Sequence, residues 1–502
     1  MYEEWIFQRG VSFSNLINYI PVAATVVTTF LSLVLARATL RYVVIDCRRQ
    51  RSDGNTFLET PMKLSQKINR RSFINQAGTL VVGAGAFSAA ASSYDRILGA
   101  NDRISLGHIG VGRRGKELAW IVAKLKEKNV EMTAVCDLWK INREAAAAQA
   151  TKDYGREPRA FQHMEELLAL KDVDAVLIST ADFQHATHLK QAVEAGKDCY
   201  CEKPMANDLE EAKAARDAVL KHKRIAQIGT QHRSEAYQIA VRDFIKSGAL
   251  GEVSKVEIVW NYHGPRWRGR SEVSQIREQD TDWRRWLLKK APRPFDPRMY
   301  FEFRLYKDFS SGIADQWMSH GIDLIHYFLD DSFPKSVMAS GGVFAWKDGR
   351  ENPDTFQALL EYPKGFLVSY STSFGNDCDS FTRIMGKAAT LVNIGGEGSP
   401  RWKWIEEKGT REDNPLIQRA EKYVTLPGSD AVPPTFIGDN DLSHMTNWIE
   451  CLRSRREPNA TVRHGFAHSV AVIMAARAYR EGRKLYWDPT KEAILDRPPK
   501  AS

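Results

Sequence analysis

The sequence predicts an α/β protein with two domains, an N-terminal Rossmann domain built on a doubly wound parallel sheet and a C-terminal α/β domain with an open, mainly antiparallel sheet. Two observations lead to this prediction. Short apolar strands alternate with helical stretches over residues 101–231, a pattern typical of a parallel sheet. Within residues 232–490, strand segments such as 253–261 and 354–362 alternate apolar and polar side chains. That alternation favours an antiparallel sheet with one packed and one free face.

Composition limits the classes of function. The chain has 502 residues, 43% hydrophobic and 26% charged, which is typical of a globular protein with two or three domains. Roughly half of the net charge of +9 lies in the first hundred residues. No basic block is interleaved with aromatic residues, so we expect no nucleic-acid partner. The six cysteines show no zinc-type spacing, so we expect buried free thiols and no metal site.

The segment NRRSFINQAGTLVVGAGAFSAAASS, residues 69–93, has the layout of a removable export signal. The pair Arg70-Arg71 precedes a short apolar run, and small residues follow near 89–92. Basic, apolar and small-residue regions in this order are typical of a signal peptide, and R-R-S-F-I resembles the twin-arginine signal. We therefore expect residues 62–92 to engage the twin-arginine (Tat) export machinery. The protein would then be periplasmic or otherwise exported.

Residues 1–61 allow two interpretations. Residues 16–36 carry no charge and are about long enough to span a bilayer, which would make the protein membrane-tethered. Alternatively, residues 1–61 are an extension upstream of a true start at Met62. A start there places the arginine pair at the usual distance from an N-terminus. Both interpretations stay open.

The strand expected at 103–109 runs into the turn Gly110-x-Gly112-x-x-Gly115, with Arg114 inside it. A helical stretch follows, and then a second strand ends at Asp137. This order is the dinucleotide-binding fingerprint. The first glycine permits the tight turn, the second permits close approach of the pyrophosphate, and the third permits close helix–strand packing.

The carboxylate of Asp137 is suited to a ribose hydroxyl and would repel a 2′-phosphate. We therefore expect NAD as the cofactor. NADP stays possible because Lys140 and Arg143 lie nearby in the sequence.

Polar residues follow the later strands, expected at 172–180, 196–201 and 224–231. Ligands of a parallel sheet bind at the carboxyl ends of its strands. We therefore expect several polar side chains to converge near the nicotinamide. These residues are Thr180, Asp182, His185, Glu202, Lys203 and Gln231.

Four motifs occur in a characteristic order: GxGxxG, T-A-D-F-Q-H, C-E-K-P and G-T-Q-H-R. In this order and spacing the chain resembles the Gfo/Idh/MocA family of oxidoreductases over about residues 103–490. The resemblance implies that Lys203, the lysine of E-K-P, lies beside the nicotinamide and the substrate hydroxyl. It also implies that the C-terminal sheet serves as a subunit interface, so we expect a homo-oligomer, a dimer or a tetramer. Arg114, Thr180, His185 and Glu202 are the further candidates for binding the cofactor.

The segment 310–328 predicts a helix that carries His320, our candidate for proton transfer. In the family this resemblance points to, an aspartate usually stands four residues before the histidine. Here that position is Gln316, and the aspartate is Asp315. Five steps on a regular α-helix lead to nearly the opposite face. Asp315 would therefore assist His320 only if the helix begins after it or bulges there.

Three segments, 261–268, 281–286 and 301–306, are rich in Trp, Tyr and Arg. Such side chains stack on sugar rings and bind hydroxyls or carboxylates. We therefore expect a sugar, polyol or sugar acid as substrate, with Arg304, Gln231, Asp323 and Lys203 as candidate substrate-binding residues.

Together these features predict an exported oxidoreductase that moves a hydride between a secondary alcohol and NAD. Because free NAD could not be replaced outside the cytoplasm, we expect a cofactor that does not dissociate. Two alternatives remain: a redox-neutral, NAD-dependent glycoside hydrolase of the same fold, and a non-enzymatic sugar-binding protein that carries the cofactor.

Overall fold

The computed structural model describes residues 103–393, 402–407, 421–423 and 439–499. The predicted signal at 62–92 and the apolar segment at 16–36 lie outside these residues. Within the described part of the chain, no helix combines the length and apolar character needed to cross a membrane.

The first domain contains a parallel sheet with the strand order β3-β2-β1-β4-β5-β6. This is the order of a Rossmann fold, in which ligands bind where the order reverses, between β1 and β4. The strands are β1 (Ile104–Ile109), β2 (Val130–Cys136), β3 (Arg159–Phe161), β4 (Ala175–Ile178), β5 (Asp198–Cys201) and β6 (Ala226–Ile228).

Every residue of β1, β4 and β5 is buried, as expected for strands covered by helices on both faces. The covering helices are α3 (Arg113–Lys124), α4 (Lys140–Tyr154), α5 (Met164–Leu168), α6 (His185–Glu194) and α7 (Leu209–His222).

The second domain is built on a mixed sheet with the order β14-β13-β12-β11-β7-β10-β9-β8-β15-β16. Its pairs are antiparallel except β7 with β10, which is parallel. The strands are β7 (Val253–Val259), β8 (Ser336–Gly342), β9 (Thr355–Glu361), β10 (Leu367–Ser373), β11 (Phe381–Gly386), β12 (Ala389–Asn393), β13 (Trp402–Glu406), β14 (Glu421–Tyr423), β15 (Leu485–Asp488) and β16 (Ala493–Leu495).

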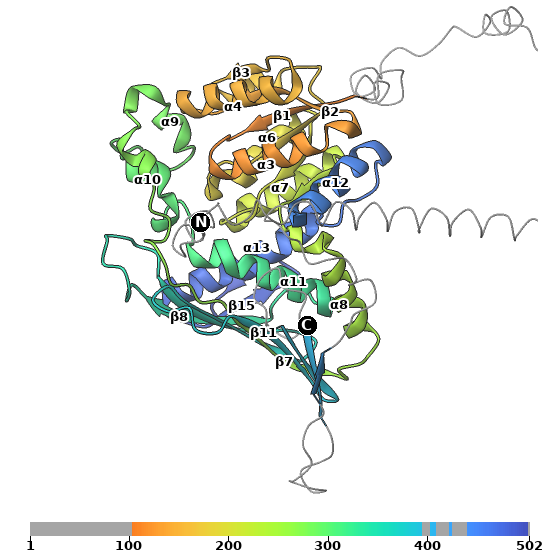
Figure 1. The fold of residues 1–502 in the computed structure, drawn as a ribbon. Coiled ribbons are helices and arrows are strands. Elements are labelled where there is room, and N and C mark those ends of the chain that lie inside the picture. Colours follow the sequence, from red (N-terminus) through yellow and green to blue (C-terminus); the bar gives the residue numbers. More distant parts are fainter. Residues whose placement is uncertain (1–102, 394–401, 408–420, 424–438, 500–502) are drawn as a thin grey trace, which may run out of the picture. The chain divides into compact units, whose positions relative to one another are not determined.

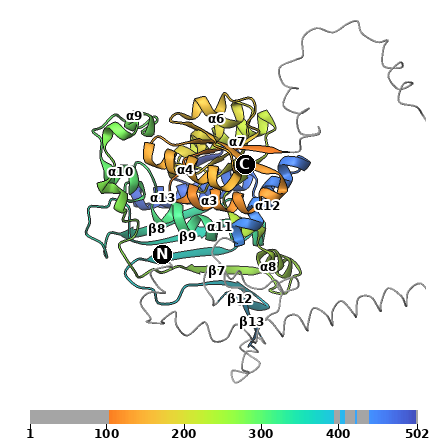
Figure 2. The ribbon, with the colours of Figure 1, turned by 45° about the horizontal axis from the view of Figure 1, so that its top comes forward.

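One face of this sheet is packed and the other is open. On β9, Phe356, Ala358 and Leu360 are buried, whereas Leu359 between them is exposed. The packed face is covered by α11 (Ser319–Leu329) and α13 (Val462–Glu481), which lie between this sheet and the Rossmann domain in both views (Figures 1 and 2). Further helices of the domain are α8 (Ala236–Lys246), α9 (Trp283–Trp286) and α10 (Pro297–Phe301).

The C-terminal part of the chain returns to the Rossmann domain. Helix α12 (Asp439–Ser454) contributes Met445, Trp448 and Ile449 to the same apolar cluster as Leu106 of β1. A linear division of the chain after residue 231 does not predict this return. It matters for the site because Asp441 of α12 pairs with Arg114, a residue that lines the cofactor cavity.

The described cysteines are free thiols. Cys136, Cys199, Cys201 and Cys451 are buried as expected, but Cys378 is exposed. The prediction of burial is therefore wrong for Cys378, which lies in the irregular segment between β10 and β11.

Candidate active site

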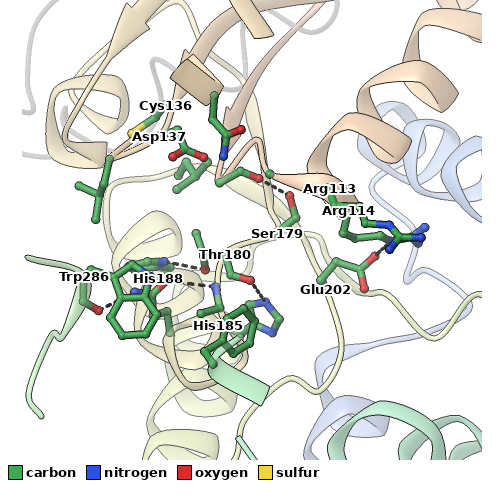
Figure 3. Close-up of a pocket in the computed structure, with 18 of the residues that line it drawn as sticks. Arg113, Arg114, Cys136, Asp137, Ser179, Thr180, His185, His188, Glu202 and Trp286 are labelled. Carbon is green, nitrogen blue, oxygen red and sulfur yellow. Dashed lines mark hydrogen bonds and ion pairs between the residues drawn. The ribbon is translucent and has the colours of Figure 1, made fainter. Parts of the chain in front are cut away.

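A cavity of about 700 Å³ opens at the carboxyl ends of the Rossmann strands and is lined by residues of both domains (Figure 3). One end is formed by the glycine turn after β1 and by Asp137 after β2. The other end is formed by Lys203, Gln316 and His320. We refer to these as the cofactor end and the reactive end.

The glycine turn at the cofactor end has the geometry that a dinucleotide requires. Gly110 has φ +83°, a conformation that disfavours side chains. A β-carbon on Gly115 would lie 2.4 Å from the carbonyl oxygen of Gly110, so the start of α3 packs directly against the turn. A β-carbon on Gly112 would lie 3.8 Å from its nearest neighbouring atom, which leaves room for a phosphate at the N-terminus of α3. These residues fit NAD.

Asp137 stands at the end of β2 and lines the same cavity. Its Oδ2 accepts a hydrogen bond from the Val111 amide and its Oδ1 accepts one from the Trp139 amide, both at 2.9 Å. Burial raises the pKa of Asp137 to about 6. Each carboxylate oxygen retains a further lone pair, so the side chain can also accept hydroxyls of a ribose. Arg143 donates to the backbone oxygen of Asp137.

Three other residues predicted to bind the cofactor, Thr180, His185 and Glu202, also line the cavity. The hydroxyl of Thr180 lies 3.1 Å from Nδ1 of His188. Glu202 receives a hydrogen bond of 2.8 Å from Nε of Arg114.

Arg114, predicted to bind the cofactor, lines the cavity as well, and protein carboxylates engage its guanidinium. Besides Glu202, it donates to both oxygens of Asp441 on α12, at 2.9 and 2.7 Å, and to Glu117 at 3.2 Å. Arg114 therefore holds Glu202 and α12 in place.

The reactive end is organised by a π-helical turn, Ala314–Met318, which immediately precedes α11. The Nζ of Lys203 donates a hydrogen bond of 2.7 Å to the backbone oxygen of Gln316 in this turn. A π-turn changes the hydrogen-bonding pattern of the carbonyls, which explains why one can accept from a side chain. This contact links the Rossmann domain to the helix that carries His320.

His320 lines the cavity and is 8% exposed. Burial, and then the positive charge of Lys203, lower the pKa of His320 well below its usual value. Burial also lowers the pKa of Lys203, to about 8. At neutral pH the two groups therefore differ in charge: His320 is neutral and Lys203 is mostly protonated.

The bulge that would permit an interaction between Asp315 and His320 is present, yet the carboxylate of Asp315 is engaged elsewhere. Its Oδ2 accepts from the Ser311 amide at 2.5 Å and from the Ser310 hydroxyl at 3.1 Å. Burial and the negative charge of Asp182 raise the pKa of Asp315 to about 7. The preceding serine turn holds Oδ2, whereas Oδ1 is buried and no described residue forms a hydrogen bond with it. The role of Asp315 as helper of His320 therefore stays a prediction.

Asp323, a predicted substrate-binding residue, lies instead in a buried ion pair. It accepts a hydrogen bond of 2.7 Å from Nε of Arg233, and Nδ1 of His468 lies 3.7 Å away. Although burial alone would raise the pKa of Asp323, the guanidinium of Arg233 holds it well below its usual range. The side chain is 1% exposed and does not line the cavity. Its role is structural.

Arg304 and Gln231, the other expected substrate residues, do line the cavity. Arg304 donates a hydrogen bond of 2.9 Å to Asp182, a fully buried residue that also receives the Ser310 hydroxyl and the Gln316 amide. The Oε1 of Gln231 and the Nδ1 of His320 are buried, and neither has a hydrogen-bond partner among the residues that the structure describes. Unpaired buried polar atoms are costly, and here they border the space available to a substrate.

Gln316 and Arg268 complete the reactive end, although the sequence did not identify either as a candidate site residue. Gln316 accepts a hydrogen bond of 3.1 Å from Arg268 and donates one of 2.9 Å to Asp182. The aromatic and arginine content of segment 261–268 points to a ligand site, but nothing in it distinguishes Arg268 from Arg266. Only some of the aromatic residues that we expect to stack on a sugar reach the cavity. Trp286 lines it, whereas Trp267 packs against Phe374 in the core.

Comparison with known proteins agrees with this geometry. Residues 104–230 match the Gfo/Idh/MocA oxidoreductase family with its NAD-binding Rossmann fold, and residues 239–392 match the C-terminal domain of the same family. A "Glycosyl hydrolase family 109 protein" of Shewanella baltica is 22% identical over 455 residues, which cover 82% of this chain and 94% of that protein. The inositol 2-dehydrogenase of Agrobacterium fabrum is 33% identical over 144 residues, 28% of this chain and 41% of its own.

Among solved structures, levoglucosan dehydrogenase in complex with NADH has a TM-score of 0.58 and 18% sequence identity, and the match covers 80% of this chain and 100% of that one. At this identity the likeness concerns the fold. The two family matches together span more than half of the chain. Their NAD-binding and C-terminal domains coincide with the two domains that form the cavity, and the protein belongs to the Gfo/Idh/MocA oxidoreductase family.

Proposed function

We propose that this protein is an NAD-dependent oxidoreductase that oxidises a secondary alcohol of a sugar, polyol or sugar acid. The observation that carries the proposal is the contact between Lys203 of one domain and the turn that leads to His320 of the other. Lys203 and His320 both line a cavity that begins in a dinucleotide-binding turn, and this supports the proposal.

The chemistry of the oxidation divides between these two side chains. Bound NAD⁺ supplies the acceptor for the hydride that leaves the carbon. His320 is neutral at pH 7 and takes the hydroxyl proton as a general base. Lys203 donates a hydrogen bond to the substrate oxygen as negative charge develops there. The C–H electron pair leaves with the hydride, and the O–H electron pair becomes part of the new carbonyl. Because the pKa of Lys203 is about 8, we expect the rate to fall above that pH.

Export is the second part of the proposal. The twin-arginine route carries folded proteins, so NAD can be bound before translocation and travel with the enzyme. With association near 10⁶ M⁻¹s⁻¹, retention for hours needs a Kd on the order of 10⁻¹⁰ M. The hydride must then be returned inside the same site, to a second substrate or to the same sugar. We also propose that the open face of the C-terminal sheet joins two or four copies of the chain.

A redox-neutral glycoside hydrolase is the second candidate. It is favoured by the family 109 relatives, whose similarity extends over 82% of the chain. In this case a hydroxyl would be oxidised to a transient ketone, the glycosidic group would be eliminated, water would add in its place, and the hydride would then return to the ketone. The same Lys203 and His320 would serve both reactions, because both begin with oxidation of a hydroxyl.

Two measurements test the proposal. Acid release of small molecules from the purified, exported protein should yield NAD or NADH, and finding no nucleotide would refute retention. Incubation with a panel of sugars, polyols and sugar acids should then change the absorbance of the reduced nicotinamide. Release of a reducing sugar from glycosides, without net change in cofactor, would favour the hydrolase. Binding of a sugar, polyol or sugar acid without either reaction would favour a non-enzymatic binding protein.

A further inference from the structure

Three arginines, Arg268, Arg270 and Arg304, line the cavity, and Arg268 contacts Gln316 at the reactive end. Arg304 is paired with Asp182. Arg268 donates from Nη2 to the neutral Oε1 of Gln316, at 3.1 Å, and its Nε has no hydrogen-bond partner in the described part of the chain. Among the residues that the structure describes, no carboxylate forms an ion pair with Arg268 or with Arg270, although both line the cavity. Both side chains are half-buried, and an anion bound in the cavity would supply the charge partner that partly buried cations normally have.

The protein holds Arg268 in place firmly. Arg266 donates to both oxygens of Glu302, at 2.6 and 2.8 Å, and the backbone amide of Arg270 donates to the same carboxylate at 3.2 Å. Glu302 thus ties down the chain on both sides of Arg268. At Arg268 itself the backbone has φ +64°, a conformation that non-glycine residues adopt rarely and mostly where structure enforces it. The backbone that carries this guanidinium is thus fixed before a ligand binds, which lowers the conformational entropy lost on binding.

The contacts of Arg268 favour a substrate anion over the cofactor pyrophosphate. Gln316 accepts Arg268 through its side chain and Lys203 through its backbone oxygen. Arg268 therefore lies beside the group that binds the reacting hydroxyl, whereas the glycine turn and the N-terminus of α3 form the other end. Burial, and then the charges of Arg304 and Arg270, lower the pKa of Arg268 well below its usual value. This mutual repulsion would be relieved by a bound anion.

We propose that Arg268 recognises a carboxylate on the substrate, and that the substrate class is the sugar acids, uronates above all. This inference rests on the proposed function and narrows it. The guanidinium offers two parallel N–H donors whose spacing matches a carboxylate. The substrate carboxylate takes no part in the chemistry; it orients the ring so that one hydroxyl meets Lys203 and His320. Arg304 and Arg270 add to the positive field.

Binding to the wild-type protein tests the proposal first. Glucuronate, galacturonate and mannuronate are titrated calorimetrically against the NADH-loaded protein, each beside its parent hexose. We expect at least one uronate to bind about tenfold more tightly than its hexose, since a hydrogen-bonded charge pair contributes about that much. Added salt should weaken the uronate and leave the hexose unaffected. If no uronate binds more tightly than its hexose, the proposal is overturned.

Variants assign the effect to Arg268. In Arg268→Met, uronate affinity should fall by about 10- to 100-fold, while the affinities for hexose and NADH stay unchanged. Arg268→Lys should lose less uronate affinity than Arg268→Met, because lysine keeps the positive charge but lacks the two parallel N–H donors of the guanidinium. The matched control is Arg285→Met. Arg285 lines the same cavity, but its charge is already paired with Glu165. That variant should bind uronates as the wild type does.

The outcomes separate the possible sources of failure. Equal loss for uronate and hexose would mean that Arg268 only positions Gln316, and loss of NADH affinity alone would assign Arg268 to the cofactor phosphates. Either result overturns the proposal. Selective uronate binding without any turnover would instead refute the proposed oxidoreductase function and leave the carboxylate site intact. Melting temperatures show whether each variant is folded, and the wild-type comparison remains decisive if one is not.

Discussion

The two ends of the cavity are built in different ways. The cofactor end comes from one βαβ unit, in which the glycine turn, α3 and Asp137 follow one another within 28 residues of chain, Gly110 to Asp137. The reactive end is assembled from distant segments: Lys203 after β5, Arg268 after β7, and Gln316 and His320 around a π-helical turn. The first end depends on backbone shape, and the second depends on side-chain contacts across two domains. Substitutions should therefore separate nucleotide affinity from chemistry.

The largest effect is expected at Lys203. Lys203→Met should lower the single-turnover rate of hydride transfer about 10³-fold, because it removes the cation that stabilises the developing oxyanion. NADH affinity, measured by fluorescence titration, should stay unchanged because the cofactor end is intact. A variant that keeps its rate would remove Lys203 from the reaction.

A large loss of stability without a change in substrate binding is expected at Asp323. Removing one partner of a buried ion pair leaves Arg233 unpaired, so Asp323→Ala should lower the free energy of unfolding by about 3 kcal/mol. Urea denaturation measures this loss. The control is Asp496→Ala, which breaks a half-exposed pair with Arg483 and should cost less than about 1 kcal/mol. If Asp323→Ala has normal stability but a raised KM, Asp323 binds the substrate and the structural role is contradicted.

At the cofactor end, two glycines should respond differently. Gly115→Ala places a β-carbon 2.4 Å from the Gly110 oxygen, so both the melting temperature of the apoprotein and NADH affinity should fall, the affinity by about 100-fold. Gly112→Ala meets nothing closer than 3.8 Å. It should lower NADH affinity and leave the apoprotein's melting temperature unchanged. Equal behaviour of the two variants would contradict the packing role of Gly115.

The smallest effect concerns Asp137 and pH. Its pKa is raised to about 6 by burial, and the ionised form is the better acceptor for ribose hydroxyls. As pH falls through that value the carboxylate becomes protonated, so NADH affinity should fall about tenfold from pH 7 to pH 5. Titrations at several pH values measure this. In Asp137→Asn the affinity should be lower and the dependence on pH lost, and a wild-type affinity that rises toward pH 5 would contradict the assignment.

The same difference between the two ends explains what could be predicted from the sequence. The Rossmann strands, the glycine turn and Asp137 are local patterns with a fixed period and spacing, and the structure has them at the expected positions. The reactive end depends on partners chosen in three dimensions. Nothing near Asp315 in sequence reveals that Ser310 and Ser311 hold its carboxylate, and nothing near Asp323 reveals Arg233 and His468. In sequence Gln316 is a departure from the family pattern, yet its backbone and side chain connect Lys203, Arg268 and Asp182.

The central claim is that Lys203 and His320 act together on one substrate carbon. It is tested most directly by tracing the hydride with ring-deuterated uronates and hexoses. In a single turnover with NAD⁺ bound, the released nucleotide should carry deuterium in the wild type, and neither Lys203→Met nor His320→Asn should transfer it at a comparable rate. Deuterium transfer that persists unchanged in both variants, or none from any sugar to the wild-type enzyme, would contradict the account.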